Sequence, residues 1–314
     1  MKKILFLDRA HLVLETRLSE LGYTCELDLK SSKTEVEKKL GNYTGIVMRS
    51  RLTLDEQFID AAKNLKFIAR EGVGLEHIPV EYAESKGIKI INSPEGSRDT
   101  VGEHAIGMLL MLLNNLSRAD HEVKNGKWVR EANRGVELMG KTVGIVGYGN
   151  MGSAFAKRLS GFGVKVLAYD KYKSAYGDAH AEEASLERLF SEAEIISLHI
   201  PMMPGNFHFV DDDFIKNFKN DIYVINTARG LVLNIADLVK NLKSGKVKGA
   251  ALDVLEYEDQ SFDGFSLEKL PADFQYLTQA KNVVLAPHIA GWSFESKRKH
   301  GEVLAQKIEK FCKK

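Results

Sequence analysis

The amino-acid sequence predicts an α/β protein with two doubly wound parallel sheets, each covered by helices on both faces. Three observations support this prediction. Short apolar runs alternate with helical segments through residues 4–91, a glycine-rich turn follows the apolar run 142–146, and a second alternating region extends to residue 285. Such alternation builds parallel sheets, because each helix returns the chain to the same edge of the sheet. The length of 314 residues accommodates two domains of this kind.

Apolar periodicity places the elements of the first region. Strands are expected at residues 4–7, 23–27, 45–48, 67–69 and 88–91, and helices at residues 11–21, 34–40, 58–62 and 80–86. Residues 92–100 are rich in helix and strand breakers, which favours a crossing between domains. Thr100 and Glu103 then form a T-x-x-E capping box, which predicts a helix that begins there and ends near Leu116. This helix is apolar nearly all round, so we expect it to be buried inside its domain or against a second subunit.

A dinucleotide fingerprint follows the strand expected at 142–146. Gly147 allows a tight turn, Gly149 lets a pyrophosphate approach the backbone, and Gly152 permits close packing of the next helix on the strand. A second strand ends at Asp170, whose carboxylate can accept hydrogen bonds from ribose hydroxyls and repel a 2′-phosphate. The segment therefore predicts a Rossmann domain that binds NAD in preference to NADP.

Later strands are expected at residues 195–199, 222–226, 249–254 and 283–285. The chain beyond residue 291 is too short for a domain, so we expect its single helix, at 295–311, to pack on the first sheet. The predicted architecture is a Rossmann cofactor domain (99–286) inserted into a discontinuous flavodoxin-like substrate domain (1–98 and 287–314), with a cleft between them.

Composition argues against several classes of partner. A net charge of +1, from 44 basic and 43 acidic residues, gives no electrostatic case for nucleic acid or a membrane surface. The apolar run at 4–7 is too short for a signal peptide, and no apolar stretch is long enough to span a bilayer. Cys25 and Cys312 have no metal-binding spacing. We expect a soluble cytoplasmic protein with no metal, nucleic-acid or membrane partner.

Arginine, glutamate and histidine recur where strands of the second region end. Arg229 follows the strand at 222–226, Glu258 lies just past the strand that ends at Asp253, and His288 follows the strand at 283–285. The carboxyl ends of strands form the ligand crevice of a doubly wound sheet. Taken singly, each residue is more often a solvated charge or a loop histidine, so the residues alone leave their role open.

The sequence resembles the D-isomer-specific 2-hydroxyacid dehydrogenase family over nearly its whole length. The matching motifs lie at residues 70–78, 92–104, 138–149, 198–201, 226–230, 251–254 and 287–291. The resemblance implies that hydride transfer with NAD interconverts a D-2-hydroxy acid and a 2-keto acid, and that Arg229, Glu258 and His288 are the catalytic residues. It also implies that Asp253 faces the nicotinamide carboxamide. The other implied cofactor contacts are Asn150, Met151, Ile200, Thr227, Ala228 and Gly291.

These residue types suit the implied chemistry. A histidine at position 288 can supply the proton for the carbonyl oxygen near neutral pH, and the carboxylate of Glu258 would favour its protonated form. Arg229 offers a planar fork of donors for the substrate carboxylate. The backbone of Gly72, Val73 and Gly74 is implied to help hold that carboxylate.

The substrate stays open at this point. Arg49 and Arg70 match arginines that contact the phosphate in the 3-phosphoglycerate dehydrogenase branch, and Arg98 adds a third cation. Glu71 would weaken the attraction for a dianion. A phosphorylated or dicarboxylate substrate and a small 2-keto acid, such as glyoxylate or hydroxypyruvate, are both compatible with these residues. Trp292 either narrows the pocket or packs under the C-terminal helix.

The resemblance also bears on regulation and assembly. The family includes corepressors that use the same fold as an NAD-dependent scaffold, and the compact length favours an enzyme over that class. No regulatory domain follows the last helix, so serine feedback is not expected. The resemblance places the helix that follows Thr100 in a two-fold subunit contact. We therefore expect a homodimer with Leu109, Leu112 or Leu113 at or near the interface.

Overall fold

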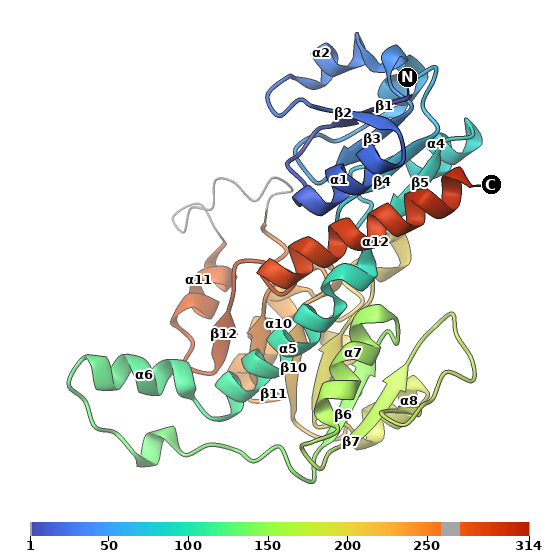
Figure 1. The fold of residues 1–314 in the computed structure, drawn as a ribbon. Helices are drawn as coiled ribbons and strands as arrows, with labels where there is room; N and C mark the ends of the chain where they lie inside the picture. The colour runs from blue at the N-terminus through green and yellow to red at the C-terminus, as the bar shows by residue number, and fades with distance from the viewer. Residues whose placement is uncertain (1, 259–270, 314) are drawn as a thin grey trace. The chain divides into compact units, whose positions relative to one another are not determined.

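The computed structural model describes residues 2–258 and 271–313, and the chain divides into two compact units (Figure 1). The first unit combines Met1–Arg98 with Trp292–Lys314, and the second comprises Asp99–Gly291. Each unit is built around its own parallel sheet. No helix in the described part of the chain is long and apolar enough to cross a membrane.

The sheet of the first unit has the strand order β2-β1-β3-β4-β5, and every pairing is parallel. This order is flavodoxin-like, and together with the second sheet it confirms the predicted fold class. Its strands are β1 (Lys2–Phe6), β2 (Tyr23–Leu27), β3 (Gly45–Met48), β4 (Phe67–Arg70) and β5 (Lys89–Asn92). Its helices are α1 (Leu12–Glu20), α2 (Lys33–Glu37), α3 (Glu56–Ala61), α4 (Val80–Ser85) and α12 (Phe294–Cys312).

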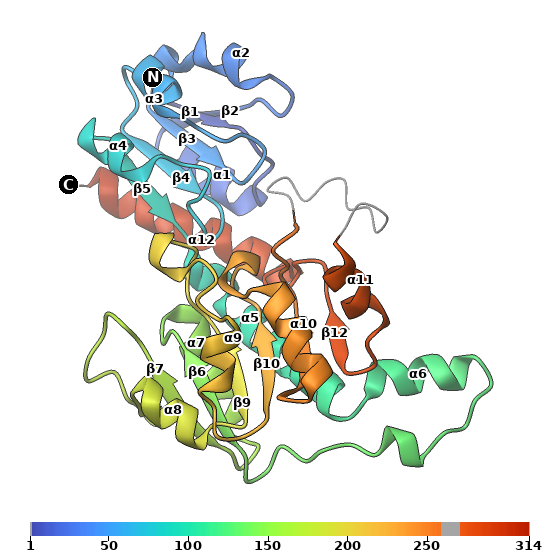
Figure 2. The ribbon, with the colours of Figure 1, turned by 180° about the vertical axis from the view of Figure 1, so that it is seen from behind.

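Helix α12 returns the C-terminal part of the chain to the first unit (Figures 1 and 2). Leu304, Ala305 and Ile308 of α12 are buried in one hydrophobic cluster with Phe6 of β1 and Leu14 of α1. Helix α12 begins with a capping box in which Ser293 and Ser296 satisfy each other's backbone N–H groups. This burial explains why so short a segment does not need a core of its own.

The sheet of the second unit has the order β12-β11-β10-β9-β6-β7-β8, and all its pairings are parallel. The order reverses at β6, which lies between β7 and β9, as in a Rossmann domain. The strands are β6 (Thr142–Val146), β7 (Lys165–Tyr169), β8 (Glu182–Glu183), β9 (Ile195–Leu198), β10 (Ile222–Asn226), β11 (Val247–Leu252) and β12 (Val283–Leu285).

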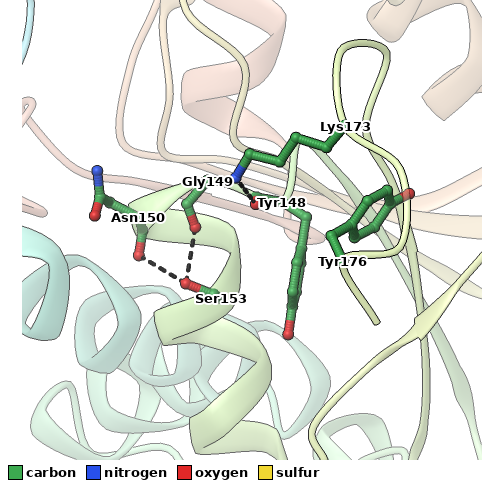
Figure 3. Close-up of a pocket in the computed structure, with 6 residues that line it drawn as sticks. All are labelled: Tyr148, Gly149, Asn150, Ser153, Lys173 and Tyr176. Carbon is green, nitrogen blue, oxygen red and sulfur yellow. Dashed lines mark hydrogen bonds between the residues drawn. The ribbon is translucent and has the colours of Figure 1, made fainter. Parts of the chain in front are cut away.

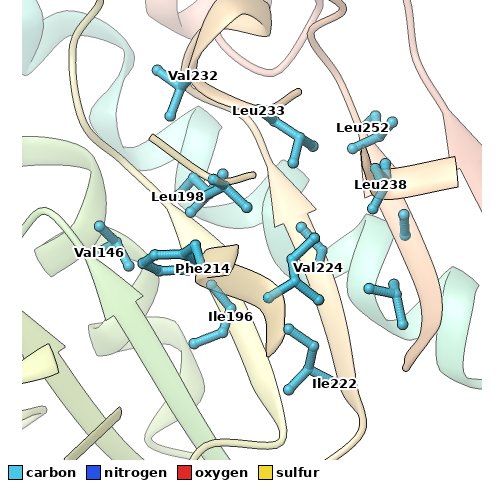
Figure 4. Close-up of a cluster of buried hydrophobic side chains, with 14 of the residues drawn as sticks. Val146, Ile196, Leu198, Phe214, Ile222, Val224, Val232, Leu233, Leu238 and Leu252 are labelled. Carbon is cyan, nitrogen blue, oxygen red and sulfur yellow. The ribbon is translucent and has the colours of Figure 1, made fainter. Parts of the chain in front are cut away.

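Helices cover this sheet, and branched aliphatic side chains fill the space beneath them. Figure 4 shows one such cluster, in which Phe214 lies among Val146, Ile196 and Val224 from three strands. The helices are α7 (Asn150–Leu159), α8 (Leu186–Glu192), α9 (Asp212–Lys216), α10 (Ile235–Ser244) and α11 (Ala272–Gln279). Short 3-10 turns lie at Leu40–Asn42, Glu131–Asn133, Pro204–Asn206 and Gly230–Val232.

The long helix α5 corrects one boundary of the sequence analysis. It runs from Pro94 to Leu113, so Thr100 lies inside the helix and its T-x-x-E pattern is not the start. Proline suits the first turn of a helix, because its φ is already helical and an N–H there has no intrahelical partner. Arg98 is an exposed residue of this helix. After a left-handed residue at Asn115, α6 (Leu116–Lys124) follows as a separate helix.

The expected interface residues of α5 are core residues of the chain itself. Leu109, Leu112 and Leu113 are buried in the cluster that contains Val143 of β6 and Phe155 of α7. Their own domain already covers these side chains, and their place at or near a dimer interface stays a prediction. Met111 and Gly107 are exposed in this chain, so its own domain does not cover every side of the helix.

Candidate active site

The glycine-rich turn joins β6 to α7 at the point where the strand order reverses. Gly147 has a φ of +95°, and a Cβ there would lie 2.8 Å from the carbonyl oxygen of His199, which follows the neighbouring β9. A Cβ at Gly152 would overlap the carbonyl oxygen of Gly147. At Gly149 nothing lies within 4 Å of an added Cβ. Two of the glycines are therefore needed for packing, and the third opens the backbone to an approaching group.

A cavity of about 340 Å³ lies beside this turn (Figure 3). Ser153 Oγ donates to the carbonyl oxygen of Gly149 over 2.8 Å, and Lys173 Nζ donates to that of Tyr148 over 2.7 Å. These bonds fix the rim of the cavity next to the N-terminus of α7, which is a favourable place for an anion. The cavity is lined by Tyr148, Gly149, Asn150, Ser153, Lys173 and Tyr176.

Asp170 follows β7 and is held against the glycine-rich turn. Its Oδ2 accepts a 2.9 Å hydrogen bond from the backbone N–H of Tyr148, and its Oδ1 accepts a 3.0 Å bond from that of Tyr172. The carboxylate is thus fixed beside the turn, where a ribose diol can reach it in a Rossmann domain. The open space at Gly149 and this carboxylate together fit a dinucleotide.

Glu258 and His288 meet at the carboxyl ends of β11 and β12. His288 Nδ1 lies 3.0 Å from Glu258 Oε2, and both side chains keep about a quarter of their surface exposed (27% and 23%). The strands β10, β11 and β12 are neighbours in the sheet, so Arg229, which follows β10, belongs to the same edge. The structure therefore brings a histidine–carboxylate pair to the edge where a ligand crevice is expected.

Backbone packing positions the loops that carry Arg229 and Glu258. A Cβ at Gly230 would overlap the carbonyl oxygen of Leu255, so the turn of Arg229 rests directly on the loop that leads to Glu258. Glu256 anchors that loop, because its Oε2 accepts a 2.9 Å hydrogen bond from Ile235 N at the start of α10. The two loops are therefore fixed against each other and against α10.

The turn before Arg229 is shaped by one buried amide. Asn226 Oδ1 accepts from Ala228 N, and Asn226 Nδ2 donates to the carbonyl oxygen of Arg229, both over 3.0 Å. Such a side chain replaces the backbone partners that the turn leaves unsatisfied. Thr227 is buried in the same turn, and its Oγ1 has no hydrogen-bond partner among the described residues. An orphaned buried hydroxyl is a suitable contact for a bound ligand.

Asp253 organises the loop that carries His288. Its carbonyl oxygen accepts from His288 N over 2.7 Å, and its carboxylate accepts from Ile289 N and Ala290 N over 2.8 and 2.9 Å. Burial raises the pKa of Asp253, but hydrogen bonds from His104, Ala290 and Ile289 outweigh burial and hold that pKa below its ordinary value. Asp253 therefore anchors this loop, whereas the sequence had suggested only a contact with the cofactor.

The candidate substrate residues of the first unit gather at the ends of β3 and β4. Arg49 Nε lies 3.8 Å from Glu71 Oε2, and its guanidinium lies 4.6 Å from the ring centroid of Trp292. Arg70 lies against Gly72, where an added Cβ would overlap the guanidinium. Trp292 is 69% exposed, which contradicts packing under α12. Glu71 is buried, and this burial raises its pKa.

Sequence reasoning missed the part that His104 plays. It occurs in a matching motif on α5, and the structure places its Nε2 3.3 Å from Asp253 Oδ1. The available signal was a histidine directly before the apolar run 105–113 of this helix. Within the described residues, no cluster of histidine, cysteine and acidic side chains could hold a metal ion.

Comparison with known proteins identifies a family for this chain and several similar proteins. A family model described as "D-isomer specific 2-hydroxyacid dehydrogenase, NAD binding domain" matches residues 106–290. The chain is 38% identical to a hydroxypyruvate reductase of Thermotoga maritima, over 91% of both chains. It is 34% identical to a D-3-phosphoglycerate dehydrogenase of Archaeoglobus fulgidus, over 93% of this chain and 54% of that protein, and so spans about half the length of the latter.

A solved structure is similar over almost the whole chain. It is the D-lactate dehydrogenase of Aquifex aeolicus, complexed with NAD and lactic acid. The TM-score is 0.82 at 28% sequence identity, and the match covers 99% of this chain and 96% of that one. Because the match covers almost the whole chain, it includes the strands that carry the glycine-rich turn and the histidine–carboxylate pair.

Proposed function

Since this chain belongs to the D-isomer specific 2-hydroxyacid dehydrogenase family, and is an NAD-dependent oxidoreductase, we propose that Arg229, Glu258 and His288 are its catalytic residues. The observation that carries the proposal is the 3.0 Å contact between His288 Nδ1 and Glu258 Oε2 at the carboxyl edge of the sheet. A carboxylate at Nδ1 orients the ring and leaves Nε2 as the candidate donor to substrate. The family membership agrees with the resemblance found in the sequence.

Each residue has a distinct part in the proposed reduction. His288 donates its proton to the carbonyl oxygen of the 2-keto acid, and Glu258 stabilises the charged ring before that transfer. Arg229 binds the substrate carboxylate through its guanidinium and polarises the carbonyl. When NADH is bound, its nicotinamide supplies the hydride that completes the reduction.

The cofactor is held by residues that fit it in this chain. Gly149 leaves open space for the pyrophosphate, and Asp170 presents a fixed carboxylate to the adenosine ribose. We propose that the buried hydroxyl of Thr227 contacts the nicotinamide end, because it lacks a partner among the described residues. The remaining contacts in the proposal are Gly147, Asn150, Met151, Gly152, Ile200, Ala228, Asp253 and Gly291.

For the substrate we propose a small 2-keto acid without a phosphate, such as hydroxypyruvate or glyoxylate. Glu71 supports this choice, because its carboxylate lies 3.8 Å from Arg49 and offsets the charge that a phosphate would need. The similarity to a hydroxypyruvate reductase over 91% of both chains agrees with it. The backbone of Gly72, Val73 and Gly74 would hold the substrate carboxylate.

A phosphorylated substrate of the 3-phosphoglycerate type is the second candidate. Arg49 and Arg70 favour it, because they lie at the ends of the paired strands β3 and β4, at the same edge of the sheet. Two arginines so placed could together bind a dianion.

Steady-state NADH oxidation tests the function directly. We would assay hydroxypyruvate, glyoxylate, phosphohydroxypyruvate, pyruvate and 2-oxoglutarate with the wild-type chain and with His288→Ala. The proposal expects the highest kcat/KM for a small unphosphorylated keto acid and little turnover by the variant. A preference for phosphohydroxypyruvate would favour the second candidate. NADH binding without any turnover would favour a corepressor-like scaffold.

We also propose a homodimer in the cytoplasm. The segment that follows α5 extends away from the second sheet (Figures 1 and 2), and it exposes Trp128 by 80% and Met139 by 73%. Exposed apolar surface of this kind is typical of a subunit contact, and a two-fold axis would bury it on both chains. The free thiols of Cys25 and Cys312 agree with a reducing compartment.

A further inference from the structure

His104 of α5 contacts the residue that anchors the His288 loop. Its Nε2 lies 3.3 Å from Asp253 Oδ1, and the side chain of Asp253 has no exposed surface. The same carboxylate accepts backbone hydrogen bonds from Ile289 to Oδ1 and from Ala290 to Oδ2. Two backbone amides and the imidazole of His104 thus converge on one buried carboxylate.

The backbone of His288 needs such an anchor. Its φ is +53°, in the left-handed region that residues with a side chain rarely adopt. A conformation of this kind persists only when the surrounding structure holds it. His288 N donates to the carbonyl oxygen of Asp253 over 2.7 Å, so Asp253 bonds to residues 288, 289 and 290 in succession.

We propose that His104 is a positioning residue. It holds the Asp253 carboxylate in place and thereby fixes the backbone conformation of His288. Without the imidazole, Asp253 Oδ1 keeps the amide of Ile289 but loses the polar ring that faces it from α5, and the buried carboxylate then turns or admits water. Either change loosens the amides of Ile289 and Ala290 and lets His288 relax from its left-handed conformation. The inference rests on the proposed function, in which His288 is the proton donor.

Two substitutions separate this role from a purely structural one. His104→Phe keeps a flat ring but removes the imidazole N–H. His104→Gln keeps an N–H donor on a side chain that has no ring. We expect His104→Phe to lower kcat by about 10- to 100-fold, with the KM for NADH within about 2-fold of the wild type, because a small displacement of a catalytic group has effects of this size. His104→Gln should recover most of the loss. His121→Phe, at an exposed histidine of α6, is the matched control and should leave kcat unchanged.

Two readouts make the test decisive. With NADH deuterated at C4, the isotope effect on kcat should rise in His104→Phe, because the chemical step becomes slower than product release. Hydrogen exchange at the amides of Ile289 and Ala290 should also become faster, and this readout needs no turnover. Unchanged kcat and unchanged exchange in His104→Phe would overturn the inference. A wild-type chain that reduces no 2-keto acid would instead overturn the proposed function, while the exchange rates would still decide the role of His104.

Discussion

His288 Nδ1 lies 3.0 Å from Glu258 Oε2, although thirty positions separate the two residues in sequence. The contact exists because β11 and β12 are parallel neighbours, so the loops that follow them leave the sheet at the same edge. Asp253 links the two loops, since it follows β11 directly and binds the backbone of residues 288–290. The pairing is therefore a consequence of the sheet and not of local sequence.

The first prediction concerns the contact of this pair. Glu258→Gln keeps the length of the side chain but removes the negative charge beside the imidazole of His288. Because the proposed reduction takes its proton from that ring, kcat for the keto acid should fall by about 10-fold or more, while the KM for NADH stays within about 2-fold of the wild type. Steady-state NADH oxidation measures both constants. A kcat equal to that of the wild type would remove Glu258 from the mechanism.

The second prediction uses two glycines of the same turn as a matched pair. Gly149→Ala adds a methyl where no atom lies within 4 Å and where φ is −93°, so unfolding should be almost unaffected. The methyl should nevertheless weaken NADH binding by about 10-fold or more, because the pyrophosphate needs that space. Gly152→Ala should destabilise the fold by about 1–3 kcal/mol, since its methyl would overlap the carbonyl oxygen of Gly147. Fluorescence titration and thermal unfolding measure the two effects, and normal NADH binding by Gly149→Ala would contradict the assignment.

The third prediction concerns Asp170 and the choice of cofactor. The wild-type chain should prefer NADH to NADPH in kcat/KM, because a 2′-phosphate would lose the ribose hydrogen bonds and be repelled by the carboxylate. Asp170→Ser should narrow the preference through a lower efficiency with NADH. Circular dichroism provides the folding control, since the carboxylate also accepts from the backbone of Tyr148 and Tyr172. Equal efficiency of the wild type with both cofactors would show that Asp170 does not discriminate.

The sequence predicted the parallel sheets and the residues at their edges, because both depend on local patterns. Apolar runs located nearly every strand, and glycine spacing located the cofactor turn. The start of α5 was missed because Pro94 and Gly96 are typical of loops, while here Pro94 occupies the first turn of the helix. The burial of Leu112 was predicted, but periodicity shows that a face is covered and not by what, and in the structure its own domain covers it.

Other features depend on contacts between segments far apart in the chain. The contact of His104 with Asp253 joins residues on α5 and after β11, and no spacing rule connects them. The contact of Arg49 with Trp292 likewise joins the end of β3 to the start of the C-terminal segment. Such pairs follow from topology and side-chain packing, which a single sequence does not provide.

The fourth prediction concerns stability in mild acid. Burial, aided by the charges of Arg70 and Arg49, lowers the pKa of His300 to about 4. The unfolded chain has an ordinary imidazole with a pKa of about 6.5 and binds more protons than the folded chain between those values, so the free energy of unfolding should fall as pH decreases through that window. His300→Asn should remove on the order of 2 kcal/mol of this loss. Urea unfolding at both ends of the window measures it, and an unchanged pH dependence would contradict the burial of a neutral His300.

The last prediction separates the proposed dimer contact from the core of the second unit. Trp128 and Met139 are exposed in the single chain, so the double variant Trp128→Ser/Met139→Ser should keep the fold but give a monomer. Leu112→Ala instead removes a core side chain and should cost about 2–5 kcal/mol in the free energy of unfolding, whatever the oligomeric state. Light scattering at micromolar concentration, read together with thermal unfolding, distinguishes the two effects. A wild-type mass equal to that of one 35.1 kDa chain would contradict the dimer, and a dimeric double variant would place the contact elsewhere. The two variants differ because the core leucines of α5, among them Leu112, are already covered within the chain. A partner subunit can therefore bury only apolar residues that remain exposed, such as Trp128 and Met139.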